Sequence, residues 1–411
     1  MLRKTVVLIL ILAIVPAAGC LERSIERPKQ PDEIDTKIAY QLTHYKNTRS
    51  YEAFSEILRF GSRAIPALDG ALNDGDAGVR LLSVRLLYII DPSNPKLPYM
   101  LNDPMPKITV ETAFFAGACR TDNAVPLLIS VMRKNGQDVL SIGKYRDIIF
   151  KNKETASEYI SFSNISDDNK IRLACAWALL QYDAPWITEM LFENATEDAD
   201  FKWLAAAISG KCASFLDEPV LLKLAALATD EMPYIQAQAA GALGETRNPE
   251  ILTPLFLLLD SPDKETADSS AIAIHKILAS MNVRDVKSKP FPEDMDELRI
   301  QLKAWWDENH EPYEKDFSAF VKRASCGLVI EGRITGIKKA EPPATPASWE
   351  IEIEVLAVRR GSFNEKKFKL RLQADEEPLV LKGGHGEFVF VFYLKSQPDG
   401  QFSLDWIENK N

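Results

Sequence analysis

Histidine and cysteine are scarce in this chain, whose 411 residues include four histidines and five cysteines. The histidines (His44, His275, His310 and His385) lie far apart, and none has a second histidine, cysteine or carboxylate at a metal-binding spacing. The sequence contains no phosphate-binding glycine loop, no dinucleotide fingerprint and no nucleophile elbow. It therefore predicts no catalytic residue, no metal site and no cofactor, and indicates a protein that is not an enzyme.

Basic charge is also in short supply. Lysine and arginine number 49 against 59 aspartates and glutamates, which gives a formal net charge of −10. A nucleic-acid-binding protein needs a basic face to neutralise phosphates, so this balance argues against a nucleic-acid partner. A hydrophobic content of 46% with 26% charged residues is typical of a globular protein, and the length predicts two or three folding units.

The N-terminus has an apolar run too short to span ~30 Å of hydrocarbon comfortably. Arg3 and Lys4 precede this run at residues 5–15, and small residues then lead to Cys20. This order is typical of a secretory signal. It resembles the signal of bacterial lipoproteins, which implies that Cys20 is lipid-modified and becomes the mature N-terminus. Ordinary cleavage after Gly19 and an uncleaved anchor are the alternatives.

This resemblance implies a location in the cell envelope, outside the cytoplasm, with the protein attached to a membrane through its N-terminal lipid. Leu21 follows the cysteine, where an aspartate often retains such lipoproteins at an inner membrane, so the outer leaflet is favoured. Residues 21–34 are polar and contain two prolines, which predicts a tether between the lipid and the fold.

The other cysteines lack the spacing of a redox or metal motif. They are Cys119, Cys175, Cys212 and Cys326, and three of them lie in apolar helical patterns. Each is expected to be a small buried hydrophobic residue. An exported protein can also form disulfides between distant cysteines, so pairing stays open.

Residues 35–285 repeat one pattern, in which a proline is followed by leucines or other apolar residues. The prolines are Pro66, Pro126, Pro185, Pro219 and Pro254. Proline is tolerated in the first turn of a helix, so each predicts the start of the second helix of a pair. The first helices begin at bulky or β-branched residues about 30 residues apart, with one double step, namely Val79, Ile108, Ile171, Phe201, Ile235 and Thr266.

Alanines gather in the middle of these first helices, which predicts close helix stacking. The best example is residues 235–259, with the core Ala239-Ala240-Gly241-Ala242-Leu243-Gly244. This stretch resembles the HEAT-like repeats named after phycocyanobilin lyases, and the resemblance covers roughly residues 50–280. It implies an α-solenoid that offers an extended binding surface.

The double step in the period covers residues 135–170. It carries two glycines and an aromatic-basic run, Lys144-Tyr145-Arg146. A degenerate repeat and an insertion both agree with this spacing. Insertions in solenoids lie on one edge and often carry binding.

Residues 286–317 are expected to end the array. From Met295 to Trp306, apolar residues recur on one face of a helix. The segment at Leu255 to Leu259 is apolar all round and needs a covering element. The sequence therefore predicts that Trp305 and Trp306 form a cap rather than a ligand-stacking site.

Residues 318–411 change to β character. Five strands are expected, at 327–338, 349–358, 366–372, 386–394 and 402–407. The second alternates apolar and acidic residues and the third alternates basic and apolar residues, so we expect these two to pair. Residues 328–334 are followed by a long strand that ends in Arg359-Arg360-Gly361, and then by residues 386–394 before Asp399-Gly400. This order resembles the netrin-like, OB-type module of tissue inhibitors of metalloproteinases, which implies a small barrel and protease inhibition. Those inhibitors depend on several disulfides, whereas this segment has only Cys326.

The sequence thus predicts a mainly α protein, a HEAT-like α-solenoid followed by a small antiparallel β-barrel. The expected function is that of a membrane-tethered scaffold or adaptor that binds protein partners through the solenoid. The alternative is a protease-inhibitor-like or ligand-binding protein that acts through the β-barrel.

Overall fold

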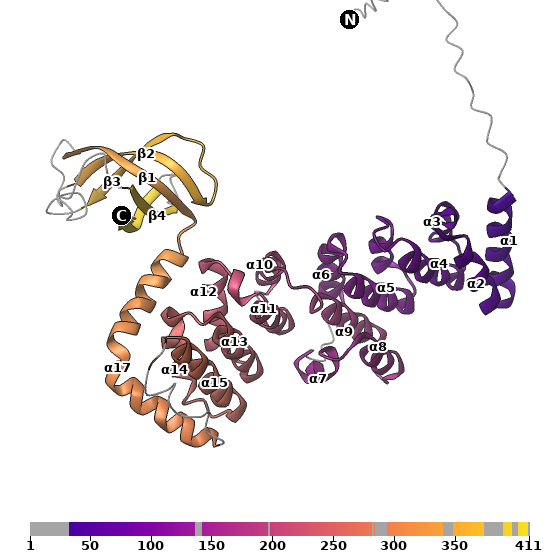
Figure 1. Ribbon diagram of the computed structural model, residues 1–411, viewed down its shortest axis with the longest axis horizontal. Helices are drawn as coiled ribbons and strands as arrows, with labels where there is room; N and C mark the ends of the chain where they lie inside the picture. Colours follow the sequence, from indigo (N-terminus) through magenta and orange to yellow (C-terminus); the bar gives the residue numbers. More distant parts are fainter. Residues whose placement is uncertain are drawn as a thin grey trace, which may run out of the picture. The chain divides into compact units, whose positions relative to one another are not determined.

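The structure, a computed structural model, describes residues 33–135, 142–195, 198–281, 283, 294–339, 348–373, 389–396 and 402–409 (Figure 1). The expected signal segment, Cys20 and most of the expected tether lie outside these ranges. The chain divides into two compact units, Met1–Leu86 and Leu87–Asn411. Among the described residues, no helix has both the length and the apolar character needed to cross a membrane.

The described part of the first unit is helical. Its elements are α1 (Glu33–Thr48), α2 (Tyr51–Arg59), η1 (Gly61–Ala64), α3 (Ile65–Ala71) and α4 (Ala77–Ile90), the last of which runs into the second unit. Ser50 caps α2, because its side chain accepts a hydrogen bond from the Glu52 amide. Arg49 adopts a positive φ of 55° between α1 and α2 and pairs with Asp76 at 2.6 Å. Helix α1 includes Glu33 and Ile34, the last two residues of the expected tether.

The second unit continues the helix pairs. Its helices are η2 (Leu97–Asn102), α5 (Pro106–Cys119), η3 (Asp122–Ala124), α6 (Val125–Lys134), η4 (Ile142–Tyr145), α7 (Arg146–Ile149), α8 (Lys153–Phe162), α9 (Asp167–Leu179), α10 (Pro185–Asn194), α11 (Ala199–Lys211), η5 (Ala213–Phe215), α12 (Glu218–Ala226), η6 (Leu227–Thr229), α13 (Pro233–Thr246), η7 (Pro249–Ile251), α14 (Leu252–Leu258), α15 (Lys264–Ser280) and α17 (Met295–Ala324). All five prolines named above lie within the first three residues of α3, α6, α10, α12 or α14, which confirms the predicted starts.

Small residues let the first helices of neighbouring pairs approach closely. A Cβ atom on Gly244 of α13 would lie 2.6 Å from the Cα of Ala273 on α15. A Cβ atom on Gly117 of α5 would meet the Cα of Ala178 on α9 at the same distance of 2.6 Å. These approaches explain why alanine and glycine gather where the helices cross.

The segment between α6 and α9 is an insertion. Helices α5 and α9 stack directly on each other although η4, α7 and α8 separate them in sequence. The inserted helices lie beside α9 (Figure 1), so the repeat continues past them. The double step in the repeat period at residues 135–170 is therefore an insertion rather than a degenerate repeat.

Helix α17 covers the end of the array. The Trp306 ring stacks on Phe256 of α14 with 4.0 Å between centroids, and the Trp305 ring lies 6.0 Å from Phe256. The predicted tryptophan cap is therefore confirmed. The helix runs through Pro312 to Ala324, so residues 318–324, which the sequence analysis placed in the barrel, are helical. Phe320 and Ala324 are buried in the array core, and this packing offsets the hydrogen bond that proline removes.

The C-terminal part is a five-stranded antiparallel sheet in the order β3-β2-β1-β4-β5. The strands are β1 (Leu328–Lys339), β2 (Ser348–Arg360), β3 (Lys367–Gln373), β4 (Val389–Ser396) and β5 (Phe402–Asn409). The sheet curls so that β3 and β5, the two ends of this order, contact each other. The fold is thus mainly α, with a curled half-barrel at its C-terminal end.

The predicted pairing of the second and third strands is confirmed. Glu352 faces Lys369 and Glu354 faces Lys367 in the register of β2 and β3. On the opposite face, Ile351, Ile353 and Leu370 are buried in the core of the sheet. The charged rows thus lie outside while the apolar rows form the core, as alternation requires.

Candidate interaction surface

The insertion exposes aromatic side chains. Ala156 and Ile160 of α8 are fully buried, whereas Phe162 is 84% exposed and Tyr159 is 43% exposed. Residues three or four apart share one face of a helix, so Tyr159 and Phe162 lie together on the outward face of α8. Phe150, which follows α7, is 52% exposed.

Several contacts fix the insertion on the array. The Trp177 indole of α9 donates a hydrogen bond to the Lys151 carbonyl at 2.9 Å. The Phe150 ring packs against Trp203 of α11, 5.6 Å between centroids, and the Lys153 ammonium lies 4.0 Å from the centroid of the Phe115 ring. The exposed aromatic face is therefore carried by a rigid support rather than by a free loop.

A buried arginine joins the insertion to two repeats. Arg172 of α9 is 1% exposed, and its Nε donates to the carboxylate of Asp200 at 2.9 Å. The same guanidinium pairs with Asp198 at 2.7 Å and donates to the Met132 carbonyl at 2.7 Å. Asp200 in turn accepts a hydrogen bond from the Ile142 amide of η4 at 2.7 Å. We call Arg172 and these four groups, the carboxylates of Asp198 and Asp200, the Met132 carbonyl and the Ile142 amide, the arginine staple.

Burial and charge oppose each other within the arginine staple. Burial raises the pKa of Asp200, and the neighbouring Arg172 guanidinium offsets only part of this effect. Burial would lower the pKa of Arg172, but hydrogen bonds and charge from Asp198 and Asp200 outweigh it and raise the pKa. The Arg172 charge thus offsets part of the cost of keeping Asp200 ionised in the interior.

A further ion pair ties the insertion to a repeat distant in sequence. Arg146 of α7 pairs with Glu265 of α15 at 2.5 Å, across 119 positions of sequence. The aromatic-basic run that contains Arg146 was the binding candidate predicted from the sequence. The Arg146 charge is engaged with Glu265, whereas Tyr159 and Phe162, which no sequence prediction named, are exposed. The available signal was an aromatic pair opposite the buried positions Ala156 and Ile160.

The sheet is joined to the array by a second cluster of charges. Arg360, at the end of β2, donates to the carbonyl of Arg323 at 3.1 Å and to that of Cys326 at 3.2 Å, so it caps α17. It also pairs with Glu218 of α12 at 3.1 Å. Arg323 is 11% exposed and lies between Glu218 and Glu250. We call this group of four side chains the ionic joint.

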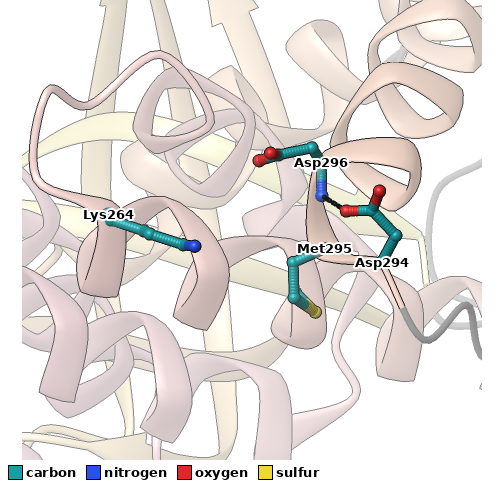
Figure 2. A pocket seen from close by; sticks show the side chains of 4 residues that line it. All are labelled: Lys264, Asp294, Met295 and Asp296. Atoms are coloured by element: carbon teal, nitrogen blue, oxygen red, sulfur yellow. Dashed lines mark hydrogen bonds between the residues drawn. The ribbon is translucent and has the colours of Figure 1, made fainter.

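A cavity of about 380 Å³ lies between the starts of α15 and α17. Lys264, Asp294, Met295 and Asp296 line it, and Figure 2 shows their side chains. The Asp294 carboxylate accepts a hydrogen bond from the Asp296 amide at 2.8 Å, which makes it a helix cap. Asp296 pairs with Arg299 on the next turn of the same helix. Among the described residues the lining includes no histidine, cysteine or hydroxyl group, and both aspartates are engaged within α17, so the cavity supports no particular chemistry.

The histidines and cysteines of the chain lie in different environments. Burial lowers the pKa of His275, which lies half-buried on α15. His385 falls outside the described residues, among which no three histidine, cysteine or acidic side chains group as metal ligands. Cys175, Cys212 and Cys326 are buried, as expected. Cys119 is exposed, and the prediction of burial is wrong there because it is the last residue of α5.

Comparison with known proteins adds little. No protein family and no curated protein matches the chain. The solved structures that resemble it include the following two. Human deoxyhypusine hydroxylase bound to glycerol is 15% identical over 52% of this chain and 96% of its own, with a TM-score of 0.24. An engineered protein is 17% identical over 72% of this chain and 86% of its own, with a TM-score of 0.27. At these scores neither likeness carries an argument about function.

Proposed function

We propose that this protein is an adaptor that binds protein partners through its helical array and acts without catalysing a reaction. The observation that carries the proposal is the exposed aromatic face of α8 on a rigid insertion. Exposed aromatic residues on a fixed support are typical of the centres of protein interfaces, where they bury a large area at little cost in entropy. The stacked repeats supply the rigid support.

We propose further that the adaptor is held at the cell envelope, outside the cytoplasm, by a lipid on Cys20. The support is the order of the N-terminal residues, from Arg3 and Lys4 through the apolar run to Cys20. Residues 21–32 would then span at most ~3.3–3.6 Å each, so the fold stays close to the membrane surface.

The alternative function places binding on the half-barrel, as the resemblance to netrin-like inhibitors implies. One observation favours it: Leu356 and Val358 of β2 are 45% and 38% exposed. An apolar strand face of this kind offers a second place for a partner.

Paired variants of the full chain separate the two sites. The protein is used to capture partners from an envelope extract in three forms, namely wild type, Tyr159→Ser/Phe162→Ser and Leu356→Ser/Val358→Ser. The adaptor proposal expects loss of the captured partner only with the α8 pair. Loss only with the β2 pair would overturn it in favour of the half-barrel. Circular dichroism of each form is used to check that the fold is intact.

A further inference from the structure

The charges around the aromatic face of α8 have one dominant sign. Between residues 146 and 168, the exposed acidic side chains are Asp147, Glu154, Glu158, Asp167 and Asp168. The exposed basic side chain in the same range is Lys151. Four of these acidic side chains are exposed and form no salt bridge with another described residue, namely Glu154, Glu158, Asp167 and Asp168. Their charges therefore face solvent.

Two further basic side chains between residues 146 and 168, Arg146 and Lys153, are engaged elsewhere. Arg146 is paired with Glu265, and the ammonium of Lys153 lies over the Phe115 ring. The side chains of Arg146 and Lys153 are both half-buried. Neither cancels the acidic charge around Tyr159 and Phe162. The outward face of α8 therefore combines aromatic rings with an excess of negative charge, which Lys151 offsets only in part.

We infer that the α8 face of Tyr159 and Phe162 binds a cationic amphipathic segment of a partner protein. Apolar side chains of such a segment pack on the two rings, and its lysines or arginines meet Glu158 and the acidic start of α9. Arginine and lysine also bind the faces of aromatic rings, so both features of the surface select the same partner chemistry. The inference rests on the proposed adaptor function and specifies its partner.

The surface is already organised for binding. The Trp177–Lys151 hydrogen bond and the Phe150–Trp203 contact hold two adjacent residues of the loop that leads into α8, and Asn152 at the end of this loop caps the helix. A partner therefore has little ordering to do at this site, which favours affinity.

A displayed library of random 16-residue peptides tests the inference with the full-length protein as bait. We expect the enriched peptides to carry net positive charge together with leucine, isoleucine or aromatic residues. Tyr159→Ser/Phe162→Ser should weaken the enriched peptides by about tenfold or more, as expected for loss of central aromatic contacts. Phe215→Ser is the control, because Phe215 is 77% exposed on η5 and should leave binding unchanged.

A second variant isolates the charge. Glu158→Gln/Asp168→Asn keeps both rings and should weaken binding of the same peptides, with a smaller dependence on salt. Enrichment of neutral or acidic peptides, the same affinity for the serine variant, or no enrichment at all would overturn the inference. A wild-type protein that dimerises in sedimentation and becomes monomeric in the serine variant would also overturn it, because a second copy would then cover the face.

These outcomes are separate from those of the adaptor proposal. If a natural partner depends on Tyr159 and Phe162 but the enriched peptides are acidic, the adaptor proposal stands and the inference about charge is wrong. If capture of the natural partner depends only on Leu356 and Val358, the adaptor proposal itself is wrong.

Discussion

Glycine at two positions of α13 has two different roles. Gly244 faces α15, where an added Cβ would lie 2.6 Å from the Cα of Ala273. Gly241 has no atom within 4 Å of its added Cβ and lies in the same helix. The first glycine is thus needed for close stacking, and the second is not.

Replacing each glycine by alanine should therefore change stability in opposite directions. Gly244→Ala forces α13 and α15 apart, and we expect it to lower the free energy of unfolding by about 1–3 kcal/mol. Gly241→Ala should raise it by about 0.5–1 kcal/mol, because alanine is the better helix former. Thermal melts of the two variants test this, and equal shifts would show that the Gly244 approach is not restrictive.

The arginine staple makes a different claim about single residues. Arg172→Met leaves the buried Asp200 carboxylate without its partner, and we expect a loss of about 3–5 kcal/mol at neutral pH. The comparison is Arg59→Met, because Arg59 is 75% exposed and its partner Glu56 lies one turn away on the same helix, and this change should cost less than about 0.5 kcal/mol.

The loss in Arg172→Met should shrink as pH falls. Burial raises the pKa of Asp200 above its unfolded value, and removing the Arg172 charge raises it further. Because its pKa is higher in the folded state than in the unfolded state, the Asp200 carboxyl binds its proton more tightly in the folded protein. The free energy of unfolding of the variant therefore rises as pH falls toward the pKa of an aspartate in the unfolded chain. Melts at about pH 7.5 and 5 measure this. Arg172→Met/Asp200→Asn should lack the effect, and its persistence there would assign it to other groups.

At the scale of elements, the half-barrel and the array meet through the ionic joint. Both faces of β4 are buried, with Phe390, Phe392 and Leu394 in the core of the sheet and Val391 and Tyr393 on the other side. A strand buried on both faces belongs to a packed interior. Outside this core, the ion pairs of Arg360 and Arg323 with Glu218 connect β2 and α17 to α12.

Arg360→Gln tests the ionic joint. The variant loses the cap on α17 and the pair with Glu218, so the connection at residues 325–327 should open more often. Protease cleavage there should rise by about tenfold, since cleavage follows the population of the open form. Arg359→Gln is the matched control, because Arg359 pairs with Glu331 inside the sheet at 2.8 Å. Equal cleavage of the two variants would contradict this role of Arg360.

At the scale of the whole molecule, the lipid that we propose on Cys20 would decide where the protein resides. Cys20→Ser should release the protein from membranes into the soluble extracytoplasmic fraction, because no acyl chain would then bury in the bilayer. Cys119→Ser, which changes the exposed thiol of α5, should stay membrane-bound. Fractionation together with mass spectrometry of the N-terminal peptide measures both. An unmodified Cys20 in the membrane-bound wild type would contradict lipid anchoring.

The candidate surface was only partly predictable from sequence. The interruption of the period located the insertion within residues 135–170, because a repeat length is a local property of the chain. It did not show that Phe162 is exposed while Arg146 is engaged by Glu265, 119 positions away. The ion pair depends on the tertiary structure that brings Arg146 to Glu265, which no local pattern contains.

The sequence by itself determined the helix pairs, their proline-led starts and the pairing of β2 with β3. These features follow from interactions within a few residues: a proline ring in a first turn, or alternation along a strand. Only the tertiary structure decided that α5 stacks on α9 past the insertion, that α17 continues to Ala324, and that Arg360 caps it. Each of these depends on groups brought together by stacking, and packing across such distances outweighs local propensity.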